Sequence, residues 1–437
     1  MSGSYANGRN RTRTSRRQIL RGAAAAAGAA IGTGAVRGFP TIWAQTVKDI
    51  TLIHIGGAWA VIKEIGEQAG KDLGFRVEMQ AVDPASQLQR SLTQPKSFDI
   101  LLNDYATVPY LRGKGVLKPI AIKDYKLWDK TLSMFTTGTF PSGKPIPDQG
   151  LSPLMTGFWD GPDATKFAGK PTDWLTLVPT VFNADTLGVR PDLVGGKDAV
   201  TSWKDLIDPK YKGKTALNDI ANVGTMDVAM ALEARGDIKY GNKGNMTRAE
   251  IDKTINLMED IKKSGQFRSF WTNFDQSVNL MASGEVMIQS MWSPAVTAVK
   301  ARGIPCYYAP LNEGYRGWAA GVSPMAHLSG LKLDCAMEYI NWYNSGWQGG
   351  FIAKQGYYSP VPDTARKFLT QAEWDYWYDG KPAAVDITDP YGTLMDKKGE
   401  VRDGGSLWKR EERIAVWNTV MDEDRYLTRR WNEFLTS

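Results

Sequence analysis

Residues able to act as general acids, bases or nucleophiles occur in this chain, but not in any arrangement typical of a catalytic site. Histidine occurs only at His54 and His327, and His54 lies inside an apolar run typical of a buried strand. The chain contains no G-x-S-x-G elbow, no P-loop, no G-x-G-x-x-G after a strand and no H-E-x-x-H. Because two carboxylates alone can perform glycoside hydrolysis, a carboxylate-dependent hydrolase stays open as an alternative.

The cysteines and histidines do not suggest a metal site. Cys306 and Cys335 are isolated from each other and from the two histidines, whereas structural zinc sites use closely spaced pairs. In an oxidising compartment the two cysteines could form a disulfide, and two buried free thiols are the alternative. We predict neither a metal nor another cofactor.

The residues best suited to bind a ligand follow predicted strands. Strand-like and helical stretches alternate from the start of the first apolar run: strands are expected at 50–55, 75–81 and 98–102, and helices at 61–71, 85–92 and 108–114. This alternation predicts βαβ units and a parallel sheet. Ligands of such sheets bind outside the carboxyl ends of the strands, which places Trp59, Asp104 and Tyr105 at a binding edge.

A second α/β region follows a turn-rich zone at 133–170, which we interpret as the first passage between two lobes. In this region strands are expected at 178–183, 215–217 and 286–288, and helices at 202–207, 226–235, 249–264 and 274–283. Two of the strands end in Asn218-Asp219 and Met291-Trp292. The chain is expected to cross again at 312–316, and a helix at 334–345 is assigned back to the first lobe.

The first 44 residues have the composition of an export signal. They contain no acidic residue and seven arginines: Arg9, Arg11, Arg13, Arg16, Arg17, Arg21 and Arg37. The Ala/Gly-rich stretch from Gly22 to Val36 follows the arginine pair, and a small residue, Ala44, precedes Gln45. A charged region, an apolar region and a small-residue cleavage site are typical of a signal peptide, and the paired arginines indicate the twin-arginine (Tat) route. A disordered basic tail, a transmembrane anchor and an uncleaved signal are the alternatives.

Removing this segment changes the charge of the protein. The whole chain carries a net charge of +6, and because seven positive charges lie in residues 1–44, the remainder carries −1. The high isoelectric point therefore does not indicate nucleic-acid binding. The remaining 393 residues suffice for two domains or two lobes.

Several segments of the chain resemble the periplasmic solute-binding proteins of bacterial ABC importers, most closely the spermidine/putrescine-binding branch. The matching pieces are Phe98-Asp99-Ile100, Arg112 to Leu117, Thr201 to Leu206, Lys210 to Lys214, Gly284-Glu285-Val286, Met291-Trp292, Ala336 to Trp342 and Gly356 to Val361. They occur in the order typical of that family and span most of residues 48–365.

The resemblance implies an α/β, two-lobed periplasmic binding protein fold, with a hinge between the lobes and the ligand in the interlobe cleft. It further implies that aromatic rings stack on an amine ligand while carboxylates pair with its ammonium groups. The positions that correspond to ligand-binding positions of the family are Trp59, Asp104, Asp219, Trp292, Trp318 and Tyr357, to which strand-end geometry adds Tyr105. At Asp104 the family has a small hydroxyl residue, so the resemblance implies that a carboxylate takes the ammonium contact here, and Asp219 lies at or one place before a carboxylate of the family.

The chain departs from the family at two expected carboxylates. Ala320 stands where the family has an amine-binding aspartate, two residues after Trp318, and a further acid beyond Asp219 is replaced at Val223 or its neighbours. Because an unpaired buried ammonium is costly, the resemblance then implies a ligand with one positive charge, or an amphiphilic or aromatic one.

These observations predict the organisation and the partners of the protein. The expected units are a Tat signal at 1–44, a first lobe at 46–175 and 316–365, a second lobe at 176–315, and an extension at 366–437 that packs on the lobes and contains a helix from Glu411 to Phe434. We expect a monomeric, non-catalytic periplasmic receptor that delivers an organic cation to an ABC permease and its ATPase. A receptor of a non-ABC (TRAP) importer is a further alternative.

Overall fold

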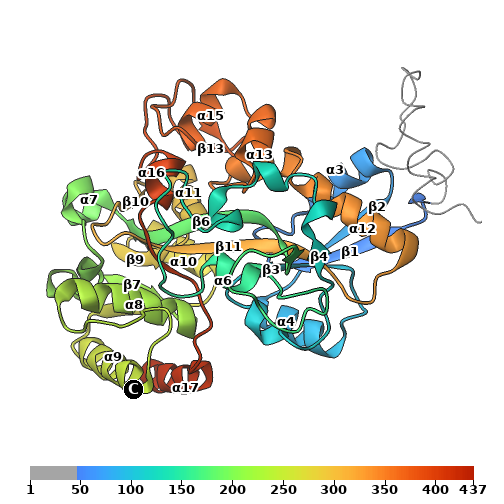
Figure 1. Ribbon diagram of the computed structural model, residues 1–437. Coiled ribbons are helices and arrows are strands. Elements are labelled where there is room, and N and C mark those ends of the chain that lie inside the picture. The colour runs from blue at the N-terminus through green and yellow to red at the C-terminus, as the bar shows by residue number, and fades with distance from the viewer. Residues whose placement is uncertain (1–46) are drawn as a thin grey trace, which may run out of the picture.

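One large mixed sheet organises the protein, whose computed structural model describes residues 47–437 (Figure 1). The strand order is β2-β1-β3-β11-β6-β9-β7-β8, with β10 and β14 added beside β6 and β11. The export signal predicted at 1–44 lies outside the described residues. Within residues 47–437, no helix is both long and apolar enough to cross a membrane.

The first half of the sheet is the predicted βαβ unit. Its elements are β1 (Thr51–Gly56), α3 (Lys63–Leu73), β2 (Arg76–Ala81), α4 (Pro84–Thr93) and β3 (Ile100–Asp104). Strand β1 pairs in parallel with both β2 and β3. Helix α3 ends at Gly74, whose φ of 78° lies in the left-handed region that favours glycine. Asp83 caps α4 by accepting a hydrogen bond of 2.9 Å from the Ser86 N–H.

The second half repeats the same architecture. Its elements are β7 (Thr215–Asn218), α8 (Ala221–Arg235), α9 (Arg248–Lys263), β8 (Phe267–Trp271), α10 (Phe274–Ser283), β9 (Ile288–Met291) and α11 (Ser293–Ala301). Strand β7 pairs in parallel with β8 and β9, which confirms the second α/β region. We refer to the β1–β3 half as lobe 1 and to the β7–β9 half as lobe 2.

Two antiparallel strands, β6 (Val178–Val189) and β11 (Tyr315–Pro324), connect the lobes. Strand β11 pairs with β3 of lobe 1, whereas the last four residues of β6 pair with β9 of lobe 2. Strand β6 therefore forms one connection between the lobes, and the turn-rich zone at 133–170 precedes it. The second passage, expected at 312–316, coincides with the start of β11. The predicted residue bounds of the lobes stay a prediction.

Shorter elements complete the molecule. They are η1 (Val108–Leu111), β4 (Ile120–Ala121), η2 (Ile122–Asp124), η3 (Trp128–Lys130), α5 (Ser133–Thr136), α6 (Pro153–Gly157), β5 (Trp174–Leu175), α7 (Pro191–Val194), η4 (Lys197–Ala199), η5 (Trp203–Ile207), η6 (Pro209–Tyr211), β10 (Tyr307–Tyr308), α12 (Gly330–Tyr343), α13 (Trp347–Ala353), α14 (Pro362–Ala365), η7 (Arg366–Phe368), α15 (Gln371–Trp377), β12 (Ile387–Thr388), β13 (Leu394–Asp396) and α16 (Leu407–Glu411). Helix α12 packs on α3, β1 and β11, in keeping with its predicted place in lobe 1.

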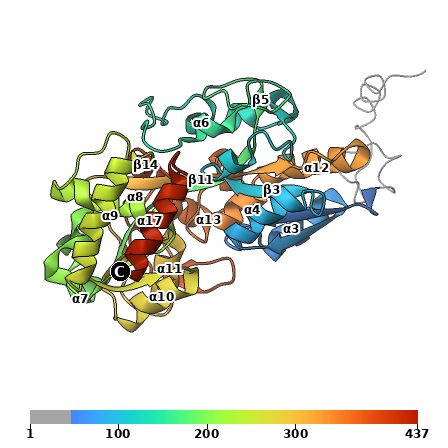
Figure 2. The ribbon, with the colours of Figure 1, turned by 90° about the horizontal axis from the view of Figure 1, so that it is seen from below.

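The predicted helix from Glu411 to Phe434 is wrong. Residues Ile414–Trp417 form strand β14, which pairs in parallel with β11, and helix α17 begins only at Asp424 and ends at Thr436. The apolar residues of this segment fit a helical period, but Ile, Val and Trp also favour strands. Pairing with the exposed edge of β11 decides between the two. Figure 2 shows α17 lying alongside α8 and α9 of lobe 2.

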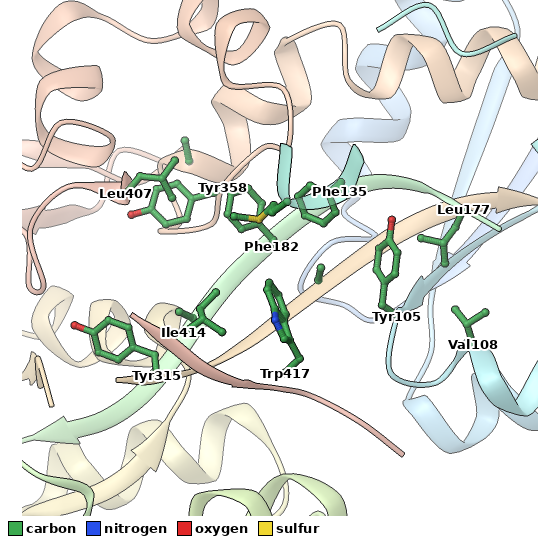
Figure 3. Packing of buried hydrophobic residues seen from close by; sticks show 14 of the residues in the cluster. Tyr105, Val108, Phe135, Leu177, Phe182, Tyr315, Tyr358, Leu407, Ile414 and Trp417 are labelled. Carbon is green, nitrogen blue, oxygen red and sulfur yellow. The ribbon is translucent and has the colours of Figure 1, made fainter. Parts of the chain in front are cut away.

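The largest hydrophobic cores are shared between the lobes and the extension. In one cluster, Leu407, Ile414 and Trp417 of the extension pack with Phe135 and Phe182 (Figure 3). A second cluster combines α17 residues with α8 and α9. The extension is therefore an integral part of the folded protein.

Cys306 and Cys335 are free thiols, both buried. They belong to different hydrophobic clusters, Cys306 to one in lobe 2 and Cys335 to one in lobe 1. Of the two alternatives left open by the sequence, the structure supports the buried thiols.

Candidate ligand-binding site

Three of the predicted ligand-binding aromatic residues meet in one cluster. Trp59 follows β1, Trp318 lies on β11 and Tyr357 follows α13. The ring centroids of Trp59 and Trp318 are 5.1 Å apart and nearly perpendicular, and the Tyr357 centroid lies 6.0 Å from Trp59 and 5.9 Å from Trp318. Trp59 is partly exposed, whereas the other two rings are buried. We call Trp59, Trp318 and Tyr357 the aromatic triad.

Local backbone features hold the triad in place. The Trp59 indole folds back over Gly57, where a Cβ atom would overlap the ring, so the Gly56-Gly57 end of β1 leaves room for it. Gly356 adopts a φ of 91° before Tyr357, and its carbonyl accepts hydrogen bonds from Asn183 and Arg402, each of 3.0 Å. Segments from three parts of the chain thus converge on one site.

Asp104 places a carboxylate on the same face of the sheet as the triad. It lies directly opposite Ala320 in the antiparallel β3–β11 pair, and directly opposed residues share a face. Ala320 is two residues from Trp318 on β11, so these two also share that face. Burial raises the pKa of the half-buried Asp104 to about 7, Arg316 opposes this shift, and Asp185 adds to it.

A buried ion-pair network, which the sequence reasoning missed, lies next to these groups. The Arg316 guanidinium is 2.7 Å from Asp227 and 3.4 Å from Asp185, and it donates a hydrogen bond of 2.6 Å to Asn418. Burial raises the pKa of Asp227 and raises that of Asp185 to about 6. The sequence does contain charged residues inside two strand-like runs, Asp185 in Val178–Val189 and Arg316 in Tyr315–Pro324. This pattern could have indicated a buried ion pair.

Trp318 belongs to this network as well as to the triad. Arg316, Tyr308 and the Trp318 side chain stabilise the ionised form of Asp185 and oppose part of its pKa shift. The Tyr308 hydroxyl lies 3.0 Å from Asp185 Oδ1. Asp104, Asp185 and Asp227 are three carboxyl groups near one guanidinium, so the region favours an additional positive charge.

Asp219 and Trp292 lie at strand ends of lobe 2, as predicted. The Asp219 N–H donates a 3.0 Å hydrogen bond to the Trp271 carbonyl, and burial raises the pKa of its carboxyl group. Among the described residues this carboxylate has no hydrogen-bond partner. Trp292 follows β9 and meets Trp271 edge to face, with ring centroids 4.9 Å apart. Both Asp219 and Trp292 are partly exposed.

Tyr105 lies in the hydrophobic core, apart from the triad. Its side chain is 4% exposed and its ring lies 6.1 Å from that of Phe135 (Figure 3). Its carbonyl accepts a 3.0 Å hydrogen bond from Thr156. Successive side chains along a strand point to opposite faces of the sheet. Asp104 therefore lies on the face of the triad, and Tyr105 lies on the opposite face.

A hollow on lobe 2 contains none of the seven predicted site residues. Its volume is about 340 Å³, and it lies between β8 and α10, lined by Ser269, Phe270, Trp271, Gln276, Asn279, Leu280, Ser283 and Glu285. Within the described residues, no group of three or more His, Cys, Asp or Glu side chains could hold a metal ion.

Comparison with known proteins identifies the family. Residues 60–381 match the bacterial extracellular solute-binding protein family. The spermidine/putrescine-binding periplasmic protein of Escherichia coli is 31% identical over 198 residues, which is 45% of this chain and 52% of that protein. The chain thus matches about half the length of this curated relative.

Solved structures agree on the fold. The spermidine/putrescine ABC transporter substrate-binding protein of Streptococcus pneumoniae superposes with a TM-score of 0.58 at 12% identity, covering 88% of this chain and 97% of that one. A putative spermidine/putrescine ABC transporter protein of Listeria monocytogenes gives 0.59 at 13% identity, with coverages of 88% and 98%. The predicted two-lobed α/β fold is confirmed, and the chain belongs to the bacterial extracellular solute-binding proteins.

Proposed function

We propose that this protein is the substrate-binding component of an ABC importer and captures a small organic cation between its lobes. The observation that carries the proposal is the aromatic triad with Asp104 on the same face of the sheet. Family membership supports the class of function. Aromatic faces attract ammonium groups, by about 2 kcal/mol when the cation is desolvated.

The charges near the triad support a cationic ligand over an anionic one. Arg316 is the guanidinium that acts on all three acids, Asp104, Asp185 and Asp227, and Arg402 adds a second positive charge beside Tyr357. An anion placed there would add to this excess of negative charge, whereas an ammonium group would reduce it.

The cross-strand pair of Asp104 and Ala320 bears on the number of charges in the ligand. The family resemblance places a carboxylate at position 320, which is alanine here, and Asp104 lies directly opposite. One carboxylate is thus available at this pair, supplied by β3 instead of β11. Asp219 and Trp292 of lobe 2 are proposed to complete the site on the opposite side, and a compact amine with one or two positive charges fits this set.

The setting proposed for the receptor is the periplasm, reached through the Tat signal at 1–44. It would act as a monomer and deliver the amine to an inner-membrane permease with its ATPase. A receptor of a TRAP importer is distinguished by its neighbouring genes, because an ABC system requires an ATPase gene. A hydrolase is distinguished by recovering a chemically altered product after incubation with a bound ligand.

Native mass spectrometry of the purified protein, followed by a thermal-shift screen, tests the ligand class. The screen contains monoamines, putrescine, spermidine, amino acids, sugars and aromatic acids. A ligand at about 100 times its Kd adds roughly 2.7 kcal/mol to the free energy of unfolding. Amines are expected to stabilise the protein, and a screen in which only anions or sugars do so contradicts the proposal.

Substitutions then test the site. Trp59→Ala is expected to weaken amine binding roughly 30-fold, in line with the loss of one desolvated cation–π contact of about 2 kcal/mol. Trp347→Ala is the matched control, because Trp347 is also partly exposed but stacks on Phe351 in lobe 1. Equal affinities for the wild type and the Trp59→Ala variant would contradict the site assignment.

A further inference from the structure

The C-terminal segment 414–437, which we call the strap, lies outside the residues that match the family and runs from lobe 1 to lobe 2. It begins as β14 beside β11 and ends as α17 on lobe 2. Figure 2 shows α17 beside the helices of lobe 2, on the side that faces lobe 1.

Trp417 anchors the strap to lobe 1. Its side chain is 1% exposed and belongs to the same core cluster as Tyr105 and Phe135 (Figure 3). The Trp417 N–H donates a 2.8 Å hydrogen bond to the Gln149 carbonyl. Because this anchor is both apolar and hydrogen-bonded, the start of the strap is fixed.

Helix α17 anchors the strap to lobe 2. Leu427, Trp431 and Phe434 are buried against α8 and α9. The Trp431 ring lies so close to Gly224 in the first turns of α8 that a Cβ there would approach it to 2.6 Å. The Trp431 indole N–H also donates a 2.8 Å hydrogen bond to the carbonyl of Asp219, one of the predicted site residues.

Asp424 joins the two lobes through its two carboxylate oxygens. Oδ2 accepts a 2.6 Å hydrogen bond from the Tyr110 hydroxyl of lobe 1, and Oδ1 accepts a 2.8 Å hydrogen bond from the Asn222 amide of lobe 2. Tyr110 lies in η1, shortly after Asp104, and Asn222 lies in the first turn of α8, shortly after Asp219. The strap thus binds the two segments that follow the predicted site carboxylates Asp104 and Asp219.

We propose that Asp424 and Trp431 are positioning residues of the ligand site, and that the strap restrains opening of the cleft and so slows ligand release. The part of this inference that concerns release rests on the proposed function, whereas the restraint on the lobes does not. Direct contacts also exist, because Gln149 and Gly150 bond the loop 241–243. Loss of the Asp424 link should therefore shift the opening equilibrium without freeing the lobes completely.

The distance between the lobes of the ligand-free full chain tests this inference directly. Spin labels are attached at Leu92→Cys on α4 and Leu193→Cys on α7, two exposed positions in different lobes. The native cysteines are buried and do not compete for the label. Pulsed electron paramagnetic resonance then reports the distribution of distances between the labels.

Tyr110→Phe and Asp424→Ala are the test variants, and Tyr426→Phe is the control. The control also removes a tyrosine hydroxyl, but its 2.7 Å bond to Asp252 stays within the strap and lobe 2. Because a hydrogen bond to a charged group is lost, each test variant is expected to raise the ratio of open to closed protein roughly 10- to 100-fold. The double variant should open no further than Asp424→Ala alone.

Two outcomes overturn the inference: test variants with the wild-type distribution, or a Tyr426→Phe control that opens as much as Tyr110→Phe. If Asp424→Ala does not fold, Tyr110→Phe decides alone, because it removes a single oxygen atom. Hydrogen exchange of residues 219–224 gives a second readout and should accelerate in a Trp431→Phe variant, which lacks the indole donor. None of these measurements needs a ligand, so a failed amine screen leaves the test of the strap intact.

Discussion

Arg316 on β11 donates a hydrogen bond of 2.7 Å to Asp227 on α8, and both side chains are almost fully buried. The same guanidinium is 3.4 Å from Asp185 on β6. Both strands that connect the lobes are thereby tied to a helix of lobe 2. Because these charged groups are buried, removal of one of them leaves the others without a partner and destabilises the protein.

Removing Arg316 should therefore destabilise the protein strongly. Arg316→Met leaves two buried carboxyl groups without their cation, and we expect a loss of about 3–5 kcal/mol in the free energy of unfolding at pH 7. Urea denaturation measures this loss. The control Arg268→Met breaks an exposed pair with Glu285 and should cost less than about 1 kcal/mol.

The loss should be smaller in acid. The folded-state pKa of Asp185, about 6, is above the unfolded value of about 3.9. Arg316 lowers this pKa, so Arg316→Met raises it further. Below about pH 6 Asp185 is protonated in both folded proteins, and the stability lost on removing Arg316 therefore grows as the pH rises above about 6. An Arg316→Met variant that loses as much stability at pH 5 as at pH 7 would show that the carboxylates are not responsible.

Much of the fold was predictable because local pattern and final structure agree. The alternating run before Gly56 and the stop at Gly74 place β1 and α3 within two residues of their observed bounds. The prediction fails where the secondary structure of a segment depends on contacts with distant parts of the chain. Ile414–Trp417 becomes a strand because β11 offers an edge, and the helix expected at 108–114 shortens to one turn that ends before Gly113, whose φ is 68°.

The pKa of Asp104, about 7, predicts that amine binding strengthens as the pH rises. Only the ionised carboxylate attracts an ammonium group, so the affinity should increase roughly 30-fold between pH 5.5 and pH 8 for a group of this pKa. Arg316 and Asp185 are the charged groups that act on Asp104. Calorimetry in buffers of different ionisation enthalpy should detect proton release near pH 6.

Asp104→Asn is the control for this pH dependence. The amide keeps the size of the side chain but cannot titrate, so the affinity of the variant should be lower at pH 8. It should also vary much less over the range than that of the wild type, with the remaining variation due to Asp185, whose pKa is about 6. A wild-type affinity that is constant between pH 5.5 and pH 8 would exclude Asp104 as the charge partner of the amine.

The thiols should be unreactive in the native protein. Burial raises the pKa of both Cys306 and Cys335 to about 12, and the thiolate is the reactive form. Titration with a thiol reagent at pH 8 without reductant should detect no thiol in the folded protein and two in guanidinium. Detection of two thiols only after reduction would indicate a disulfide.

The candidate site was only partly predictable from the sequence. Trp59, Trp318 and Tyr357 each stand beside a turn or on a strand that matches the family, and the structure brings them together. The Arg316 network was missed because Asp185 and Asp227 are distant from it in the chain. Their pairing depends on the register of β6 with β11 and on the packing of α8, which no local pattern encodes.

Gly224 in helix α8 provides a test of how closely α17 is seated. Replacing a helical glycine by alanine ordinarily stabilises a helix by up to about 1 kcal/mol. Here the added methyl group would overlap the Trp431 ring and the Asn218 carbonyl, so Gly224→Ala should instead destabilise the protein by about 1–3 kcal/mol, as overpacked cores do. Thermal or urea unfolding measures the change.

Trp431→Leu removes the ring. In that background Gly224→Ala should lower the free energy of unfolding by less than it does in the wild type, because the two substitutions act on one contact. An unchanged cost would place the conflict entirely at the Asn218 carbonyl, and a stabilising Gly224→Ala would mean that α17 is not packed against α8 at this point.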